Sequence, residues 1–268
     1  MNKNQQSLYN LNWLHSIGIK YYCSTKKDSK ICTNTATITH DSVPRVIKSK
    51  EANPKSQQKV MKSQSHNAAE TARHSADQAN NLTELRYAVE NFTECELKQF
   101  ANSTVFADGQ VDAKILLIGE APGVTEDEQG IPFCGTSGKL LDEMLNTIDI
   151  SRKKNAYITN TIFWRPPANR RPTIEEINIC KPFVEKHIAL IKPNLIILVG
   201  NTATTSLLGT TEKISNIRQN NYFYTNKYLN QDILTTAIFH PAYLLRQPMQ
   251  KKATWFDLLR IQAMLQQF

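Results

Sequence analysis

The residues whose types and spacing best suit chemistry form one turn, GEAPGVTEDEQGIPF, at residues 119–133. The five residues before it are a largely apolar run that predicts a buried strand. Gly119 and Gly123 let the backbone turn sharply and approach a ligand closely, and Pro122 fixes the path between them. A phosphate-binding loop needs glycine amides and a lysine, so the sequence disfavours nucleotide binding here. The turn instead gathers an aromatic ring and four carboxylates: Phe133, Glu120, Glu126, Asp127 and Glu128.

Three further unusual segments also lie at the ends of predicted strands. Asn160 ends a strand at residues 156–160, Gly200 and Asn201 close a strand that begins at residue 195, and HPAYLLR follows a strand at 235–239. In open α/β sheets, ligands bind in the crevice outside the carboxyl ends of the strands. We therefore expect the four segments to converge on one site.

The side chains of Glu120, Asn160, Phe133 and His240 together suit a nucleobase. The amide matches a Watson–Crick edge, the ring stacks, and the histidine donates to a carbonyl that becomes anionic as the base departs. A carboxylate nearby orients water or stabilises an oxocarbenium-like transition state. Taken singly, Asn160 also fits a turn or helix cap, His240 a loop hydrogen bond, and Phe133 the core.

The segment HPAYLLRQPMQKK places an apolar pair beside basic residues. Such a pair can enter a base stack while the cations hold flanking phosphates. Leu244 and Leu245 equally suit ordinary helix packing, and Arg246, Lys251 and Lys252 equally suit a solvated face. Both interpretations stay open on the residues alone.

The elements that position these segments alternate along the chain. Strands are predicted at residues 114–119, 156–160, 195–200 and 235–239, and helices at 82–92, 137–148, 173–191, 201–208 and 250–266. Thr173 and Glu176 form a capping box at the start of the third helix. This alternation predicts an α/β fold, a three-layer α/β/α sandwich with a central, mostly parallel four-stranded sheet.

Composition divides the chain into two parts. Residues 1–81 contain 12 Lys or Arg against 5 Asp or Glu, a charge of +7, whereas residues 82–268 contain 20 against 19. Few large apolar residues occur between residues 24 and 80, so we predict a basic, flexible tail with a short helix possible at 5–18. The compact domain is predicted at 82–268.

The spacing of the cysteines and the modest hydropathy disfavour a disulfide-rich, secreted or membrane protein. The five cysteines include no CxxC pair, which disfavours a disulfide framework or a complete metal site. No run approaches the roughly 20 apolar residues of a membrane helix, and the N-terminus lacks a secretory core. We expect a cytoplasmic protein with no membrane association.

Three motifs resemble the type 4 uracil-DNA glycosylase family, within the uracil-DNA glycosylase superfamily. They are GEAPGVTEDEQGIPFCGTSGKLLDEML, YITNTIFWRPPANRRPTIEEINICKPF and HPAYLLRQPMQKKATWFDLL, and the match covers roughly residues 82–268. The resemblance implies catalytic roles for Glu120, His240 and Glu126, the last coupled to Asn169. It implies substrate contacts from Ala121, Phe133 and Asn160. It further implies DNA contacts from Leu244, Leu245, Arg246, Arg165, Arg170 and Lys251.

The chain departs from the family pattern at the iron–sulfur cluster. Cys95 and Cys180 match two of four cysteine ligands, but Phe92 and Trp164 occupy the other two positions. Two ligands do not hold an ordinary four-cysteine cluster, so we expect no cofactor. The alternative is that Cys23 or Cys32, in the predicted flexible tail, supplies a missing ligand. Residues 161–172 also lack the histidine with which one relative traps DNA covalently.

We therefore expect a monofunctional glycosylase that flips uracil out of DNA, cleaves its N-glycosidic bond with water and initiates base excision repair. Its partner would be uracil-containing DNA, single- or double-stranded, and we expect a monomer. The alternatives are a non-catalytic DNA-binding or polymerase-accessory module, and a nucleoside or nucleotide hydrolase.

Overall fold

A six-stranded sheet runs through the centre of the computed structural model, which describes residues 55–266. The order is β1 (Asp108–Gly109), β3 (Ala156–Asn160), β2 (Ile115–Gly119), β4 (Leu195–Val199), β6 (Ile233–Ile238) and β5 (Tyr222–Tyr224). The four inner strands are parallel, as their continuous apolar runs predict. The predicted helix at 5–18, Cys23 and Cys32 lie outside the described residues.

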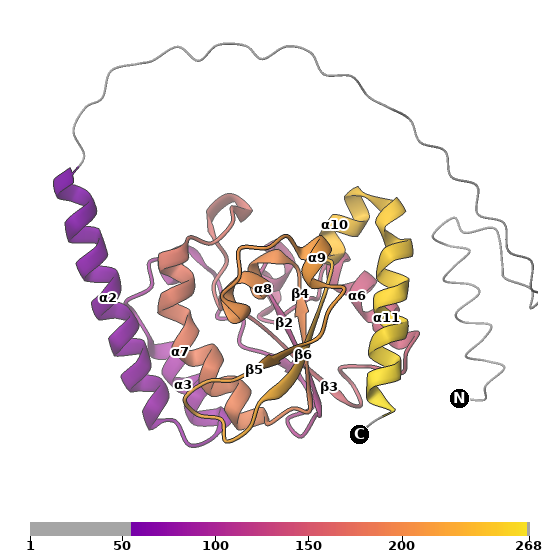
Figure 1. Cartoon of the computed structure of the whole chain (residues 1–268). Helices are drawn as coiled ribbons and strands as arrows, with labels where there is room; N and C mark the ends of the chain where they lie inside the picture. Colours follow the sequence, from indigo (N-terminus) through magenta and orange to yellow (C-terminus); the bar gives the residue numbers. More distant parts are fainter. Residues whose placement is uncertain (1–54, 267–268) are drawn as a thin grey trace, which may run out of the picture.

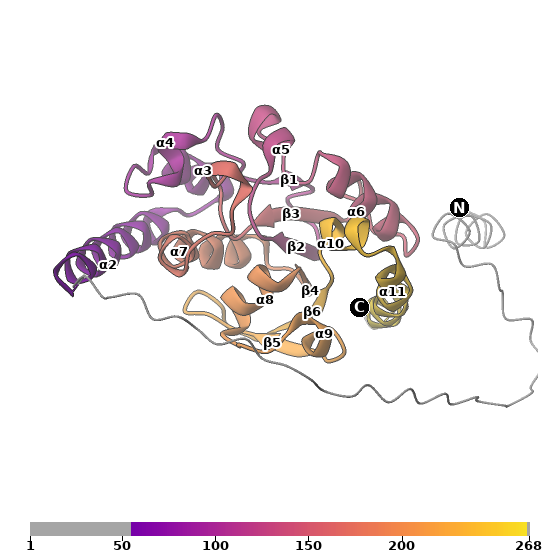
Figure 2. The same cartoon turned by 90° about the horizontal axis from the view of Figure 1, so that it is seen from above.

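Helices cover both faces of the sheet and complete a three-layer α/β/α sandwich (Figures 1 and 2). One layer contains α2 (Lys55–Gln78), α3 (Leu82–Asn91), α7 (Ile174–Ile191), α8 (Asn201–Leu208) and α9 (Ile214–Ile217). The other contains α6 (Thr136–Asn146), α10 (Pro241–Arg246) and α11 (Lys251–Leu265). Short segments connect them: α4 (Leu97–Phe100), α5 (Val124–Gln129), η1 (Pro167–Asn169) and η2 (Pro248–Gln250). The predicted fold class is confirmed.

Two edge strands were missed by the sequence prediction of a four-stranded sheet. Strand β1 has two residues and β5 has three, and each pairs antiparallel with an inner strand. Neither is long enough to carry a period-two apolar pattern, which is the signal that identifies a strand in a sequence. The four predicted strands correspond to β2, β3, β4 and β6.

Helix α2 corrects the prediction of a flexible tail through residue 81. The side chains of Ala68, Ala72 and Ala76 are buried on one face of the helix, and Ala79 continues that face. A stripe of alanines carries little hydropathy, so composition alone underestimates how well it packs. The structured chain therefore begins before the predicted boundary.

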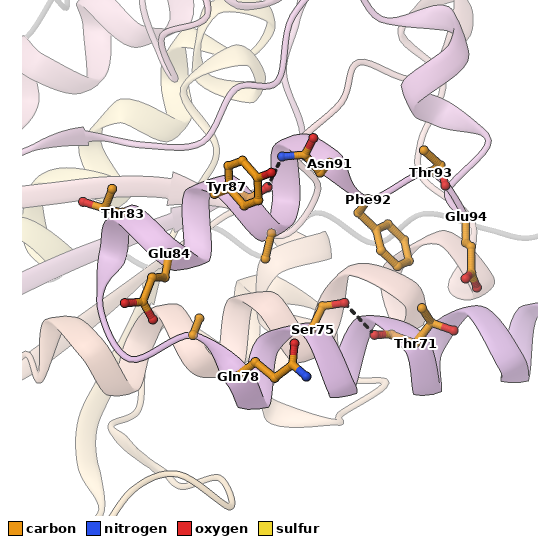
Figure 3. Close-up of a pocket in the computed structure, with 12 residues that line it drawn as sticks. Thr71, Ser75, Gln78, Thr83, Glu84, Tyr87, Asn91, Phe92, Thr93 and Glu94 are labelled. Carbon is orange, nitrogen blue, oxygen red and sulfur yellow. Dashed lines mark hydrogen bonds between the residues drawn. The ribbon is translucent and has the colours of Figure 1, made fainter.

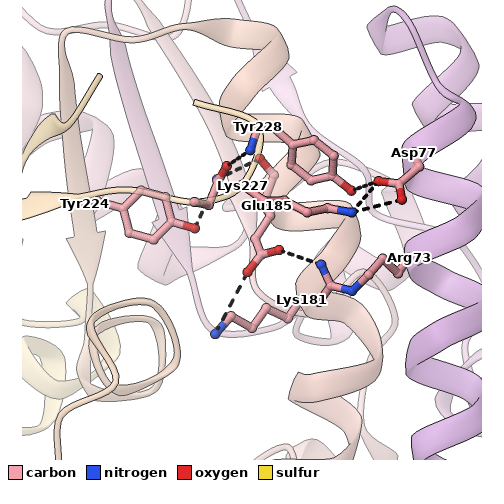
Figure 4. Close-up of polar contacts among 8 residues, drawn as sticks. Arg73, Asp77, Lys181, Glu185, Tyr224, Lys227 and Tyr228 are labelled. Carbon is pink, nitrogen blue, oxygen red and sulfur yellow. Dashed lines mark hydrogen bonds and ion pairs between the residues drawn. The ribbon is translucent and has the colours of Figure 1, made fainter. Parts of the chain in front are cut away.

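Ion pairs attach α2 to the rest of the domain (Figure 4). Asp77 accepts from Lys227 Nζ at 2.6 Å and from the Tyr228 hydroxyl, while Arg73 pairs with Glu185 of α7 at 3.4 Å. The bonds from Lys227 and Tyr228 lower the pKa of Asp77. Because these pairs are partly exposed, the buried alanines rather than the charges dominate the attachment.

A groove of about 630 Å³ separates α2 from α3 (Figure 3). Its walls combine small polar side chains, such as Thr71, Ser75 and Thr83, with the apolar side chains of Ala88 and Phe92. The groove lies away from the carboxyl ends of the parallel strands. Among residues 55–266, no helix is long and apolar enough to span a membrane.

Candidate active site

The carboxyl ends of the inner strands bring the predicted segments together. Gly119 of β2 pairs with Asn160 of β3, and β4 pairs with β6 up to Val199 and Ile238. Gly200 has φ +92°, and a Cβ there would lie 2.9 Å from His240 Cβ. The turn after β4 therefore packs directly against His240, and any side chain at position 200 would displace the histidine.

The Glu120 carboxylate is oriented by a residue from another strand end. Thr202 Oγ1, in the first turn of α8, donates to Glu120 Oε2 at 2.5 Å. The Glu120 backbone is also fixed, since its carbonyl accepts from the Thr161 hydroxyl at 2.6 Å and from Ile162 N at 3.1 Å. The carboxylate is therefore held in one direction by β3 and α8 together, which suits a group that orients water.

Asn160 is the most unusual polar residue of the site. Its side chain is 1% exposed, yet its Oδ1 has no hydrogen-bond partner in the described protein. Buried polar atoms are nearly always paired, and an unpaired one costs about 1–3 kcal/mol. A Cβ at Gly119 would lie 2.4 Å from this oxygen and 2.4 Å from Phe133 Cζ. The amide and the ring thus meet over a position that only glycine can occupy.

His240 completes the group with a defined tautomer. Its ring lies 5.7 Å from the Phe133 ring, centroid to centroid, at an interplanar angle of 32°. Its Nδ1 accepts from Ala242 N at 3.1 Å, so a neutral imidazole carries its proton on Nε2. Burial lowers the pKa of His240, against the opposing effect of the Glu120 carboxylate. The residue is therefore a neutral donor at physiological pH.

The backbone of Phe133 adopts a conformation that other parts of the fold maintain. Its φ is +52°, which is costly for an aromatic residue. Arg152 donates to the carbonyls of Pro132 and Phe133 at 2.8 and 2.9 Å, and its guanidinium also binds Asp142. A Cβ at Gly138 would lie 1.8 Å from the Phe133 carbonyl oxygen. Arg152 and Gly138 therefore fix the direction of the ring.

The structure does not bring Glu126 and Asn169 together as the resemblance implied. Glu126 accepts from the backbone amides of Gly123 and Gly135 at 3.1 and 2.8 Å, which closes the first turn of α5 and joins it to the start of α6. Asn169 is exposed, and its Oδ1 accepts from Arg165 Nε at 2.8 Å. Glu126 here shapes the loop that carries Phe133.

The four carboxylates of the opening turn also separate, because residues 124–129 form helix α5. Asp127 is buried and accepts from the backbone amides of Asn102 and Ser103 at 2.8 and 3.1 Å, while Glu128 is exposed. The prediction that all four crowd together is wrong, since helical geometry sends successive side chains in different directions. Ala121 is half-buried beside Glu120.

The predicted DNA-binding residues fall into three environments. Leu244 is fully buried against α6 and α11, so the structure assigns it to the core rather than to a duplex-invading pair. Leu245 is 43% exposed, Arg246 is exposed and Lys251 is half-buried. Arg170 forms a bidentate pair with Glu176, at 2.9 and 2.5 Å.

The two family cysteines lie next to bulky rings. Cys95 and Cys180 are both buried, and both are free cysteines. The neighbouring Cys95 thiol and burial raise the pKa of Cys180, which keeps it protonated. The Phe92 ring stacks on Trp164 with centroids 6.5 Å apart, and Trp164 Nε1 donates to Thr104 at 2.9 Å. No cluster of three or more metal-binding side chains occurs within the described residues. These residues do not fit a four-cysteine cluster.

Thr202 and Arg152 are functional candidates that the sequence analysis missed. Neither belongs to a motif that predicts a role. Thr202 contacts Glu120, 82 residues earlier in the chain, and Arg152 contacts the carbonyls of the residues 19 and 20 positions before it. The position of Thr202 just past a strand end offered a signal. Arg152 offered no such signal, because it lies in the loop that follows α6, far in sequence from any predicted site residue.

The fold and the site together define an α/β protein in which a carboxylate, an amide, an aromatic ring and an imidazole converge at the carboxyl ends of the parallel strands. The sequence matches the model of the Uracil DNA glycosylase superfamily over residues 106–261. A "Type-4 uracil-DNA glycosylase" of Sulfurisphaera tokodaii is 34% identical over 184 residues, which cover 67% of this chain and 83% of that protein. Proteins of the same name from Saccharolobus solfataricus and Thermotoga maritima are 34% and 36% identical, over 69% and 59% of this chain and 87% and 80% of their own lengths. The chain belongs to the uracil-DNA glycosylase superfamily.

Proposed function

We propose that this protein is a monofunctional uracil-DNA glycosylase, which flips deoxyuridine out of DNA and hydrolyses its N-glycosidic bond. The product is an abasic site, the starting point of base excision repair. The substrate would be single- or double-stranded DNA bound by a monomer. The type-4 name of three relatives and the strand-end site support this proposal.

The observation that carries the proposal is the unpartnered Oδ1 of Asn160 beside the ring of Phe133. Uracil presents an N3–H donor next to the O4 acceptor, which an amide oxygen and amide nitrogen satisfy together. With the Asn160 amide in the orientation of the structure, cytosine would set its N3 acceptor against the amide oxygen and its C4 amino group against the amide nitrogen. The buried oxygen that the folded protein leaves unpaired thus gains its partner from a flipped uracil stacked on Phe133.

The remaining groups act on the bond that breaks. As the C1′–N1 bond lengthens, its electron pair moves onto the uracil ring, and the His240 Nε2–H stabilises the negative charge at O2. Glu120, held by Thr202, orients a water whose oxygen bonds to C1′ and stabilises the cationic sugar. The water's proton leaves to solvent or to the departing base.

We also propose that this member of the superfamily works without an iron–sulfur cluster. The support is chemical: two of the four ligand positions hold buried free cysteines, and the other two hold stacked aromatic rings, which offer iron no thiolate. The catalytic groups lie on other elements. Iron and acid-labile sulfide analysis of protein purified without oxygen would test this, and about four irons per chain, the count of one such cluster, would refute it.

Excision from a uracil-containing oligonucleotide, followed by alkaline cleavage of the abasic site, tests the main proposal. Wild-type protein should cut at uracil, and Glu120→Gln and His240→Asn should lose most activity while still binding the oligonucleotide. Intact strands across salt and pH would favour a non-catalytic DNA-binding or polymerase-accessory module. Release of uracil from free deoxyuridine at a comparable rate would favour a nucleoside hydrolase.

A further inference from the structure

A second concave surface lies beside α10, between the end of α9 and the first half of α11. It is a groove of about 600 Å³. In Figures 1 and 2, α11 lies next to α10, and η2 joins the two helices. The groove residues on which the inference depends are Arg218, Met249, Lys252, Phe256 and Arg260. None of them belongs to the site at the strand ends.

The floor of this groove carries excess positive charge. Arg218 donates to Asp257 Oδ1 at 2.7 Å, and Arg260 donates to the Arg218 carbonyl and, at 3.0 Å, to Thr236. Among the described residues Arg218 thus has a carboxylate partner, whereas Arg260 is hydrogen-bonded only to neutral oxygens. The Nε atoms of both arginines and Oδ2 of Asp257 are buried without a partner in the described part of the chain. Exposed Lys252 adds a further cation at the rim. Uncompensated charge in a partly desolvated groove attracts an anion such as a backbone phosphate.

The rim of the same groove offers apolar platforms. Phe256 is 59% exposed and Met249 is 87% exposed, although both are large apolar side chains. Exposed rings beside cations are the combination with which proteins hold single-stranded nucleic acid, since every base has a face that stacks. A peptide that docks through an apolar face would offer no anion to Arg260 and Lys252, whereas the phosphates of a nucleic acid would.

We propose that this groove binds a single-stranded segment of DNA flanking the flipped nucleotide. The inference rests on the proposed function, because α10 and the strand-end site give the DNA its path to the groove. Phosphates would pair with Arg218, Arg260 and Lys252, and a base would stack on Phe256. The groove thereby extends the DNA contact beyond Leu245 and Arg246.

Fluorescence anisotropy with oligothymidylates of about 4 to 16 nucleotides, the range of single-stranded site sizes, tests the groove without requiring excision. The full-length double variant Lys252→Gln/Phe256→Ser should bind the longest oligonucleotide about tenfold more weakly, the loss expected for one stacked base and one phosphate. The matched control, Lys114→Gln/Phe100→Ser, changes an exposed lysine and an equally exposed ring elsewhere. It should bind as wild type does.

Three results would decide the matter. A loss that grows with oligonucleotide length in the groove variant alone supports the proposal. Equal affinity of wild type and variant, or an equal loss in the control, overturns it. A loss with duplex DNA but none with single strands also overturns it, and assigns the groove to duplex backbone. Uracil excision is measured separately on the wild-type protein. If the wild type removes no uracil, the proposed function is refuted, but the binding measurements still test the groove.

Discussion

Thr202→Val removes the one side-chain hydrogen bond that the Glu120 carboxylate accepts within the described residues, and it preserves the shape of the side chain. The hydroxyl lies 2.5 Å from Glu120 Oε2, which is the geometry of a strong bond to a charged acceptor. Such a bond contributes about 1.5–3 kcal/mol. If all of that is realised in the transition state, kcat should fall about 10- to 100-fold, at 1.36 kcal/mol per tenfold change in rate.

The effect should fall on kcat rather than on KM. Thr202 acts through Glu120 and lies outside the group of Asn160, Phe133 and His240 that would hold the base. Thr202→Ser keeps the hydroxyl and should retain most of the rate. Thr205→Val is the matched control, since within residues 55–266 its hydroxyl bonds only the Thr202 carbonyl, one turn back in the same helix. It should leave kcat unchanged.

Steady-state excision from a uracil oligonucleotide, with melting temperatures for each variant, measures these quantities. Wild-type kcat in Thr202→Val would refute the positioning role. An equal loss in the valine and serine variants would also refute it, because the hydroxyl would then be irrelevant. A loss confined to KM would indicate substrate binding in place of orientation of Glu120.

The remaining predictions concern packing, protonation and metal. Gly119→Ala should lower kcat/KM more than about 100-fold with the fold retained by circular dichroism, because its Cβ would lie 2.4 Å from Asn160 Oδ1; near-wild-type activity would contradict the site geometry. Burial lowers the pKa of His187 to about 3, so its contribution to stability is complete above pH 6.5 and is lost as pH falls toward 3. Urea melts should reveal that loss, on the order of 5 kcal/mol at its limit, and His187→Gln should flatten the pH dependence of stability; an unchanged slope would count against it. Cys95→Ala/Cys180→Ala and exposure to a chelator should each leave excision intact, whereas loss of activity in both would indicate a bound metal.

The sequence determined the fold class and the family because those depend on signals that are local or repeated. Apolar runs marked the four inner strands, and the capping box at Thr173 and Glu176 marked the start of α7, where both hydrogen bonds of the box form. The convergence of Glu120, Asn160 and His240 also followed, since parallel strands end at one edge. The sequence also showed directly that two of the family's four cluster positions hold cysteines and that the other two hold aromatic residues.

Tertiary structure decided which side chains face one another. The partner of Glu120 is Thr202 on another helix, Leu244 turns into the core while Leu245 does not, and Glu126 bonds loop amides in place of Asn169. Alanines on α2 became a packing face only because α7 lies against them. Sequence patterns report periodicity along one element, whereas these contacts depend on the relative placement of distant elements, which no local pattern encodes.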